Sequence, residues 1–411
     1  MPTGPATPLA GMRVVELASF VAAPLGAMTL RQLGAEVVRV DLPGGGPDIA
    51  RWPLSPQGVS MYWAGLNRGK RSACIDWRTE QGAELVAQLV AESGPEGGVM
   101  ITNTAGRGAL SFAALAERRP DLIHVTVLGL HDGSPAVDYT VNATLGFPAI
   151  TGPEESTTPT NQVLPAWDVA CGLYTATAVL AADRRRTAGP QRLTVALEDV
   201  ALATAGSLGY LAEAEVGGVR RLPIGNALYG SFGRDFESSD GVRFMVVTLT
   251  PRHWRDLLAV TDTEVVVAGI EAHVGADFTD EGDRFRHRHL IAPLIAAWFE
   301  ARPADTVRAA LATTPVLWSQ YGTFAQLVAD PDGRLSSNPS MHRLDQHGVG
   351  EHWSPGLPVV WSDHHRPAEP APTLGGDTRA VLSDWLGLIE AELHALEGSG
   401  AIAGPELRRA P

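Results

Sequence analysis

The chain has 411 residues and a formal net charge of −14 at pH 7, which argues against a nucleic-acid-binding protein because such a protein needs a basic face. Its length permits two domains with ample cores. Cys74 and Cys171 lie far apart in sequence, so we expect no disulfide framework and a reducing, cytoplasmic environment. Without signal-peptide features or an apolar run long enough to span a bilayer, we expect no membrane insertion.

The first predicted elements form a βαβ unit. The pattern predicts a strand over residues 12–17, a helix over 24–33 that opens on a proline, and a strand over 37–41. The turn between the first strand and the helix lacks the G-x-G-x-x-G fingerprint. An ordinary dinucleotide site is therefore not expected there.

A compact basic turn follows at residues 67–72, where Arg68, Lys70 and Arg71 surround a glycine. Three cations in such a turn can hold a phosphate or pyrophosphate through charge-assisted hydrogen bonds. A solvated surface turn explains the same residues equally well, so both interpretations remain open from this segment.

Alternation of strands and helices continues along the chain and predicts a Rossmann-like, mainly parallel sheet. Ligands of such sheets bind beyond the carboxyl ends of the strands. The predicted elements are a strand over 73–76, a helix over 79–92 and strands over 99–102, 122–127 and 193–197. The turns expected at the carboxyl ends are 18–23, 103–108 and 128–133.

Asp168 stands directly before a long apolar segment, since residues 169–182 contain no charge. This pattern predicts a buried helix that begins at Asp168. An aspartate there accepts hydrogen bonds from unpaired backbone N–H groups and tends to stay ionised at the positive end of the helix dipole. Capping is the usual role of such an aspartate, but an ionised, oriented carboxylate can also be a nucleophile.

Two domains are expected. A large Rossmann-like domain over residues 1–215, which ends in a predicted helix over 199–215, is completed by 331–411 returning to it. A smaller α+β domain over 225–330 begins with a glycine-bearing loop at 225–236. Its predicted elements are a strand over 243–248 and helices near 254–259 and 290–301.

Two histidine clusters, at residues 286–289 and 363–365, lack the separated ligand spacing of known zinc signatures. We therefore expect no metal site. The sequence also contains no G-x-S-x-G elbow, H-E-x-x-H motif or P-loop.

Several segments together resemble the class III CoA-transferases, a family that includes α-methylacyl-CoA racemases and the formyl-CoA and carnitine CoA-transferases. The resemblance covers nearly the whole chain and rests on the order and spacing of the segments. It implies an interlocked homodimer, an acyl-CoA thioester as substrate, and no cofactor beyond the coenzyme A of that substrate. The segments are 9–15, 22–24, 33–41, 67–72, Asp168 with Gly172, and 374–378.

The resemblance also implies roles for individual residues. Asp168 would be the nucleophile, carrying acyl groups as a mixed anhydride and then CoA as a thioester. The positions that would bind the CoA moiety are Val21, Ala22, Arg39, Lys70, Arg71, Asn103 and Arg107. The candidate substrate contacts are Asp138, Tyr139, Asn142, Gly225, Asn226 and Arg234.

The residue before Asp138 distinguishes between the reactions that the resemblance allows. The racemases of the family place a histidine directly before the aspartate that corresponds to Asp138, whereas this chain has Val137. Racemisation needs two acid/base groups, so the loss of one favours acyl or CoA transfer. The glycine-bearing loop at 225–233 is a candidate source of N–H donors for oxyanions, and Arg234 or Arg51 is a candidate partner of a distal carboxylate.

One branch of the family resembles this chain more closely: enzymes that move CoA between the two carboxyls of a single unsaturated five-carbon dicarboxylate. An intermolecular transferase that uses a separate donor and acceptor is the alternative enzyme. A CoA-ester-binding protein in which Asp168 only caps a helix is the non-enzymatic alternative. The segments that carry the closer resemblance are 20–26, 62–67, 137–142, 164–168, 228–237 and 280–286.

Overall fold

The structure is a computed structural model that describes residues 7–361 and 364–405. Contacts divide the chain into two compact units. Unit 1 comprises Met1–Leu145, Val163–Val219 and Asp330–Pro411, and unit 2 comprises Gly146–Gln162 and Arg220–Ala329. Among the described residues, no helix combines the length and apolarity needed to cross a bilayer.

Unit 1 is built on a seven-stranded sheet with strand order β12-β3-β2-β1-β4-β5-β6. All neighbouring strands pair in parallel except β12, which is antiparallel to β3. The predicted mainly parallel sheet is confirmed. Its strands are β1 (Arg13–Leu17), β2 (Glu36–Asp41), β3 (Arg71–Ile75), β4 (Val99–Thr102), β5 (Ile123–Leu128), β6 (Gln191–Ala196) and β12 (Ile402–Ala403).

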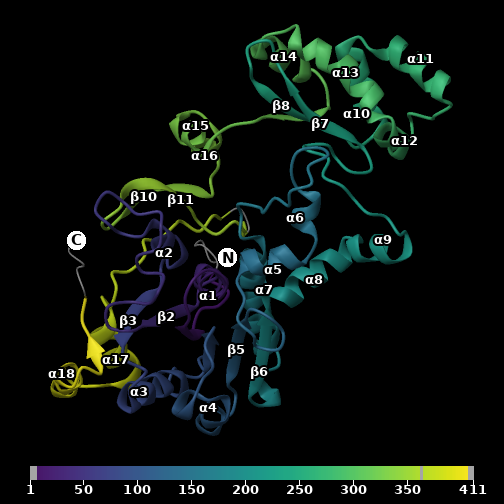
Figure 1. The fold of residues 1–411 in the computed structure, drawn as a ribbon. Coiled ribbons are helices and arrows are strands. Elements are labelled where there is room, and N and C mark those ends of the chain that lie inside the picture. Colours follow the sequence, from purple (N-terminus) through teal and green to yellow (C-terminus); the bar gives the residue numbers. More distant parts are fainter. Residues whose placement is uncertain (1–6, 362–363, 406–411) are drawn as a thin grey trace. The chain divides into compact units, whose positions relative to one another are not determined.

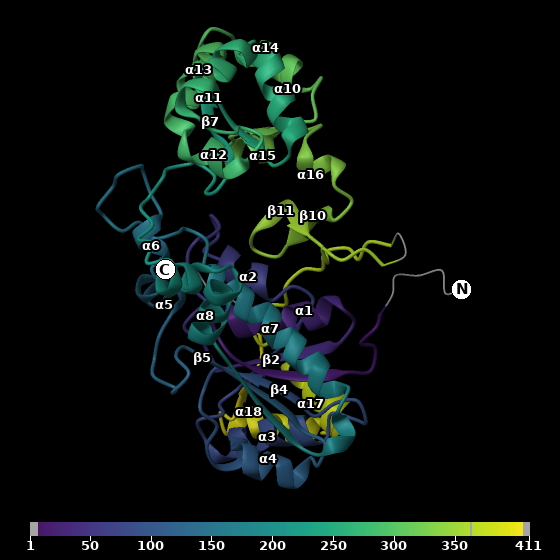
Figure 2. The ribbon, with the colours of Figure 1, turned by 90° about the vertical axis from the view of Figure 1, so that its right-hand side faces the viewer.

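Helices cover both faces of this sheet (Figures 1 and 2). Alternating βα connections require this arrangement, because a parallel sheet is apolar on both sides. One face carries α1 (Ala22–Gln32) and α7 (Ala166–Asp183), and the other carries α3 (Glu80–Ala91), α4 (Phe112–Arg118), α17 (Thr378–Leu386) and α18 (Glu390–Gly398). The other helical elements are α2 (Met61–Leu66), η1 (Gly108–Leu110), α5 (Asp138–Thr144), η2 (Arg186–Ala188), α8 (Leu197–Ser207) and α9 (Tyr210–Val216).

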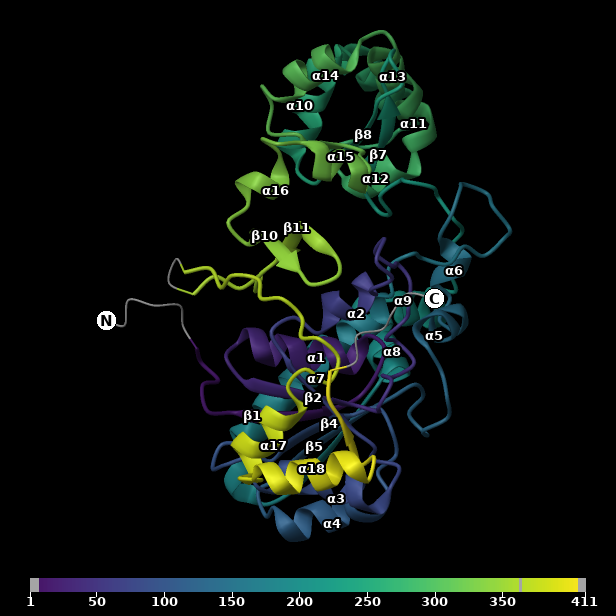
Figure 3. The same cartoon turned by 90° about the vertical axis from the view of Figure 1, so that its left-hand side faces the viewer.

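The C-terminal tail packs on the edge of the sheet of unit 1. Ile402 pairs with Ile75, while Ser72 donates its backbone N–H to the Asp377 carboxylate over 2.9 Å. Figure 3 shows α17 and α18 beside α3. Trp385 of α17 lies in the same apolar core as Leu85 of α3. The tail also contains α16 (Arg334–Ser337) and the hairpin of β10 (Met341–Gln346) and β11 (Gly350–Pro355).

The turns that follow β1, β4 and β5 meet at one edge of the sheet. Leu17 at the end of β1 is in register with Thr102 at the end of β4, and Thr102 with Thr126 on β5. Asn103 joins two of the turns, donating its side-chain N–H to the Ser19 carbonyl over 2.9 Å. The expected position of these turns at the carboxyl ends of the strands is confirmed.

Unit 2 contains a three-stranded antiparallel sheet of β7 (Phe232–Glu237), β8 (Arg243–Thr248) and β9 (Leu317–Gln320). Its aromatic core includes Phe236 and Phe299, whose ring centroids lie 4.9 Å apart. The helices are α6 (Phe147–Ile150), α10 (Pro251–Thr261), α11 (Glu264–Val274), α12 (Glu281–Arg286), α13 (Arg288–Glu300), α14 (Ala304–Leu311) and α15 (Phe324–Ala329).

Three segments differ from the sequence predictions. The loop predicted over 225–236 becomes strand β7 from Phe232 onward, because Phe232 and Phe236 point into the apolar core of unit 2. The helix predicted over 199–215 is broken into α8 and α9 at Gly209, whose φ of +81° is left-handed. Residues 146–162, which we expected in the large domain, pack with unit 2.

Candidate active site

Asp168 is the third residue of α7, within the first helical turn. The predicted helix is present, but the capping group comes from elsewhere in sequence. The Asp138 carboxylate accepts the backbone N–H of Trp167 over 2.7 Å and that of Asp168 over 3.1 Å. Within residues 7–361 and 364–405, no side chain or backbone group hydrogen-bonds to the Asp168 carboxylate. The alternative in which Asp168 itself caps α7 is therefore wrong.

Asp138 and Asn142 hold the start of α7 from the neighbouring helix α5. The Trp167 indole N–H donates to the Asn142 side-chain oxygen over 3.0 Å. Asp138 and Asn142 are 2% and 1% exposed. These hydrogen bonds position the start of α7, and the predicted substrate contacts of Asp138 and Asn142 stay predictions. Tyr139 is half exposed and donates its hydroxyl to the Val163 carbonyl, so its proposed substrate contact stays a prediction.

Two glycines set the distance between α1 and α7. A Cβ on Gly172 would lie 2.8 Å from the Ala22 carbonyl oxygen, and one on Gly26 would lie 2.8 Å from the Gly172 carbonyl oxygen. Contacts this short exclude larger side chains at either position. The close approach fixes the turn of α7 that carries Asp168 against α1, which begins at Ala22.

The surroundings of Asp168 make its carboxylate unusually basic. Burial raises its pKa to about 6, the charge of Asp138 adds to the increase, and the charge of Arg51 opposes it. At neutral pH such a carboxylate is still mostly ionised, yet it is a stronger nucleophile than an ordinary aspartate. From the helix dipole we predicted only that Asp168 stays ionised, so the increase in its pKa was not predicted.

Arg51 lies between two aromatic rings on the same side of unit 1 as Asp168. Its guanidinium carbon is 5.5 Å from the Phe20 ring centroid and 5.2 Å from that of Tyr62. Burial raises the pKa of Tyr62 to about 12, with Arg51 opposing and Asp168 adding to the increase. The phenol therefore stays protonated at neutral pH, where it can donate a hydrogen bond.

Cys171 lies one helical turn after Asp168 and is fully buried. Burial and the charge of Asp168 raise the pKa of its thiol to about 12. A neutral, buried thiol is a poor nucleophile, so Cys171 is not a candidate for nucleophilic chemistry.

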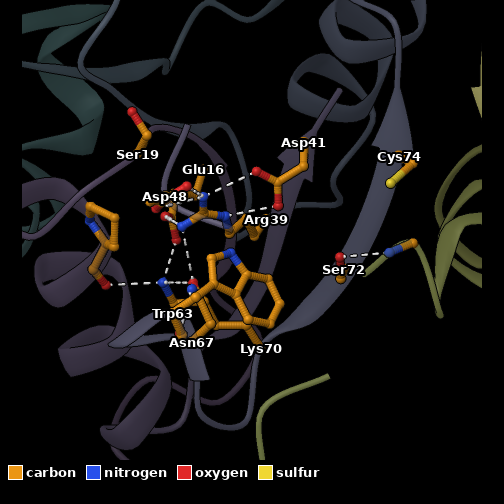
Figure 4. Close-up of polar contacts among 12 residues, drawn as sticks. Glu16, Ser19, Arg39, Asp41, Asp48, Trp63, Asn67, Lys70, Ser72 and Cys74 are labelled. Carbon is orange, nitrogen blue, oxygen red and sulfur yellow. Dashed lines mark hydrogen bonds and ion pairs between the residues drawn. The ribbon is translucent and has the colours of Figure 1, made fainter. Parts of the chain in front are cut away.

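Arg39 and Lys70 are buried and ion-paired in unit 1, and their predicted CoA contacts stay predictions. Figure 4 shows both cations inside unit 1, where their side chains are 0% exposed. Lys70 donates to the Glu16 carboxylate over 2.6 Å and to the Pro24 carbonyl over 2.9 Å. Arg39 pairs with two further carboxylates, Asp41 over 2.9 Å and Asp48 over 3.0 Å.

This buried network consists of Glu16, Arg39, Asp41, Asp48 and Lys70. A charge in a protein interior must be paired to offset its loss of hydration. The sequence pattern could not reveal this use, because the carboxylates come from three different segments of the chain.

The other predicted CoA contacts have different environments. Arg71 pairs with Glu36 over 2.8 Å and with Asp384 over 2.9 Å, so its charge is compensated. Val21 and Ala22 are buried where α1 begins. Arg107 is exposed directly before η1. The predicted CoA contacts of these residues and of Asn103 stay predictions.

Arg107 lines a cleft of about 920 Å³ in unit 1, beyond the end of β1. Trp77, Arg78, Thr79 and Arg118 also line this cleft and were not predicted from the sequence. Residues 77–79 could have been predicted from their position, because they follow the predicted strand 73–76 and therefore lie beyond a strand end. Arginines and an aromatic ring in one cleft suit a nucleotide with its phosphates.

Gly225, Asn226 and Arg234 belong to unit 2, whereas Asp168 belongs to unit 1. Gly225 has a φ of +61° and donates its N–H to the Gly152 carbonyl over 3.1 Å. Arg234 lines a pocket of about 640 Å³ between β7 and α13. The predicted substrate contacts of these three residues stay predictions.

The histidine cluster at 286–289 forms an ion-pair site, with His289 3.4 Å from the Glu154 carboxylate. Asp363 of the second cluster lies outside the described residues. In the part of the chain that the structure describes, His131, Glu198 and Asp199 bring possible metal ligands within 4.8 Å of one another. His131 and Asp199 are exposed and His131 contacts Glu198 over 2.6 Å, which accounts for the group as a surface ion pair.

The α/β fold places the half-buried Asp168 carboxylate in the first turn of α7, and the model of CoA-transferase family III matches residues 9–378. The chain belongs to this family, and the predicted family is confirmed. It is 45% identical over 402 residues to the 2-methylfumaryl-CoA isomerase of Chloroflexus aurantiacus, covering 97% of this chain and 98% of that protein.

More distant relatives share the length of the chain. The succinyl-CoA–D-citramalate CoA-transferase of Chloroflexus aurantiacus is 26% identical over 422 residues, covering 97% of this chain and 99% of that protein. The crystal structure of a CAIB/BAIF family protein from Brucella suis is 26% identical and superposes with a TM-score of 0.75 over 93% of this chain and 100% of that chain.

Proposed function

We propose that this protein moves CoA between the C1 and C4 carboxyls of 2-methylfumaryl-CoA, also called mesaconyl-CoA. The observation that carries the proposal is the Asp168 carboxylate, which is half buried, has a raised pKa and is left without a hydrogen bond because Asp138 caps the helix. The full-length similarity to the 2-methylfumaryl-CoA isomerase supports this choice of substrate.

In the first half of the reaction, an oxygen of Asp168 attacks the C1 thioester carbonyl. The carbon–sulfur bond breaks and CoA leaves as a thiolate, so Asp168 and C1 are joined as a mixed anhydride. The thiolate then attacks the Asp168 carbonyl carbon, which releases the C1 carboxylate and leaves CoA as a thioester on Asp168.

In the second half, the C4 carboxylate of the same dicarboxylate attacks the thioester on Asp168 and expels CoA thiolate. The resulting anhydride joins Asp168 to C4. Attack of the thiolate on the C4 carbonyl forms the new thioester and regenerates the Asp168 carboxylate. No proton is gained or lost, which fits a site in which the nearby Tyr62 phenol stays protonated.

Arg51 is the better candidate for holding the distal carboxylate, because its charge acts directly on Asp168 within unit 1. Backbone N–H groups of the 225–233 loop are proposed to stabilise the oxyanions. The site must also exclude water, since anhydrides hydrolyse and the free dicarboxylate must turn around before it escapes.

The CoA nucleotide is proposed to occupy the cleft beside Arg107, where Arg78 and Trp77 add a second cation and an aromatic surface. We also propose a homodimer. Leu173 and Tyr174 on α7 and Leu202 on the neighbouring α8 are exposed, and apolar side chains on adjacent helices suit burial against a second copy.

Turnover of mesaconyl-CoA in the presence of isotope-labelled free mesaconate tests the intramolecular route. We expect little label in the product, because the dicarboxylate stays bound between the two halves of the reaction. Label incorporation that rises in proportion to added mesaconate would instead establish an intermolecular transferase. The Asp168→Asn variant, which retains shape but cannot form the anhydride, is the control for uncatalysed exchange.

A further inference from the structure

Asp48 connects the buried ion network to the loop that carries Phe20. Its side chain is 1% exposed, and both carboxylate oxygens lie 3.0 Å from the Arg39 guanidinium. One of these oxygens also accepts the backbone N–H of Phe20 over 3.0 Å. Figure 4 shows Asp48 between Arg39 and the segment that leads to α1.

Phe20 needs such an anchor because its backbone is strained. Its φ of +69° lies in the left-handed region, which is uncommon for a bulky residue. A conformation of this kind costs about 1 to 3 kcal/mol and persists only when surrounding contacts hold it. The Phe20 side chain is 39% exposed, so core packing does not supply the full restraint.

The backbone of Asp48 anchors Arg51 as well. The Arg51 N–H donates to the Asp48 carbonyl over 3.1 Å, and the Ser60 hydroxyl donates to the Arg51 carbonyl over 2.5 Å. Arg51 in turn stacks on the Phe20 ring. Asp48 thus contacts the backbones of both residues in this stack, one through its side chain and the other through its carbonyl.

We propose that Asp48 is a positioning residue for the transfer reaction, holding Phe20 and Arg51 as one wall of the site that faces Asp168. The inference rests on the proposed function for the reaction that it assists. Arg39 orients the Asp48 carboxylate through contacts to both of its oxygens, which gives the Arg39–Asp48 pair a role in the site without contact to CoA.

An amide cannot replace this carboxylate. In the Asp48→Asn variant an amide N–H₂ replaces one of the two oxygens, so it opposes Arg39 in one orientation and both Arg39 and the Phe20 N–H in the other. We expect kcat to fall about 10- to 100-fold, since small misplacements in a site have effects of that size, while KM changes less than threefold.

Asp41→Asn is the matched control. Asp41 is buried and pairs with the same Arg39 guanidinium, but it makes no contact with Phe20. Both variants remove one carboxylate from the network, so a general loss of stability affects both. We expect Asp41→Asn to retain kcat within threefold of the wild type, with a thermal midpoint close to that of Asp48→Asn.

Equal kcat values for the two variants, or a loss that appears only in KM, would overturn the inference. Wild-type protein without turnover of mesaconyl-CoA would instead refute the proposed function. If Asp48→Asn does not fold, Phe20→Leu carries the test. It should lower kcat at least fivefold with an unchanged thermal midpoint, and an unchanged kcat would again contradict the role of this wall.

Discussion

The Asp138 carboxylate caps the helix that carries Asp168, accepting the Asp168 N–H over 3.1 Å. Asp138 therefore satisfies the backbone N–H groups at the start of α7, and the Asp168 carboxylate remains available for chemistry. The same proximity raises the pKa of Asp168, since two negative charges disfavour each other.

Replacing Asp138 with asparagine separates these two effects. The amide oxygen still accepts a backbone N–H, but the negative charge is gone, so we expect the pKa of Asp168 to fall. The acid limb of a kcat/KM profile against pH should move to lower pH. Asp138→Ala also removes the cap and should cost about 1 kcal/mol of unfolding free energy. An unmoved acid limb in Asp138→Asn would contradict the assigned coupling.

Asp168→Asn should abolish transfer and stabilise the protein at high pH. A carboxyl whose pKa is higher in the folded than in the unfolded state lowers stability above the folded pKa, and this cost disappears below the unfolded pKa. The folded pKa is about 6 and the usual unfolded pKa is about 3.9.

We therefore expect the free energy of unfolding of Asp168→Asn to exceed that of the wild type by up to about 3 kcal/mol at pH 8. The difference should shrink as the pH falls from 6 toward 4. Urea denaturation of both proteins at pH 8 and pH 4.5 measures this. A destabilised variant at pH 8 would indicate that Asp168 supports the fold instead.

Gly172→Ala should disturb the site through the packing of α7. The added Cβ would meet the Ala22 carbonyl oxygen at 2.8 Å, so α1 and α7 must separate. We expect a loss of about 1 to 3 kcal/mol in unfolding free energy, together with a lower kcat. Gly206→Ala in α8 is the control, because its nearest neighbour is 3.8 Å away and alanine favours a helix. Equal stabilities of the two variants would refute the packing argument.

Arg51→Gln should lower kcat/KM about 10- to 100-fold, the size expected for a lost charge-assisted hydrogen bond to the distal carboxylate. Because the charge of Arg51 lowers the pKa of Asp168, its removal should also move the acid limb to higher pH. Arg234→Gln is the matched comparison. A larger loss in Arg234→Gln than in Arg51→Gln would reassign the carboxylate contact to unit 2.

Arg107→Ala should weaken binding of the CoA moiety, because Arg107 is exposed in the nucleotide-sized cleft. We expect the KM for mesaconyl-CoA to rise about tenfold while kcat changes little, as for an interaction made equally in ground and transition states. Arg71→Ala tests the alternative position, since Arg71 is already paired with two acids. A rise in KM confined to Arg71→Ala would place the phosphates at the basic turn.

The alternation of strands and helices was sufficient to predict the parallel sheet, because each element carries its own hydrophobic period. The break between α8 and α9 was not predicted. The segment around Gly209 is mostly apolar, and the signal for a helix end in Gly206 and Gly209 was not used; the left-handed backbone of Gly209 separates the two helices.

The site was predicted only in part. Asp168 stood out because an acid precedes a long apolar segment, but its cap lies 30 residues earlier in sequence. Arg39 and Lys70 looked like phosphate ligands because a sequence shows charges without their partners. Pairing with Glu16 and Asp48 depends on the order of strands in the sheet, and short-range patterns carry no information about it.

Mass spectrometry of the protein after incubation with mesaconyl-CoA tests the central claim most directly. Rapid acid quenching followed by proteolysis should reveal CoA attached through a thioester to the peptide that contains Asp168, and hydroxylamine should convert this adduct to a hydroxamate. We expect the adduct in the wild type and no adduct in Asp168→Asn. Full turnover without any adduct, or undiminished turnover by Asp168→Asn, would contradict it.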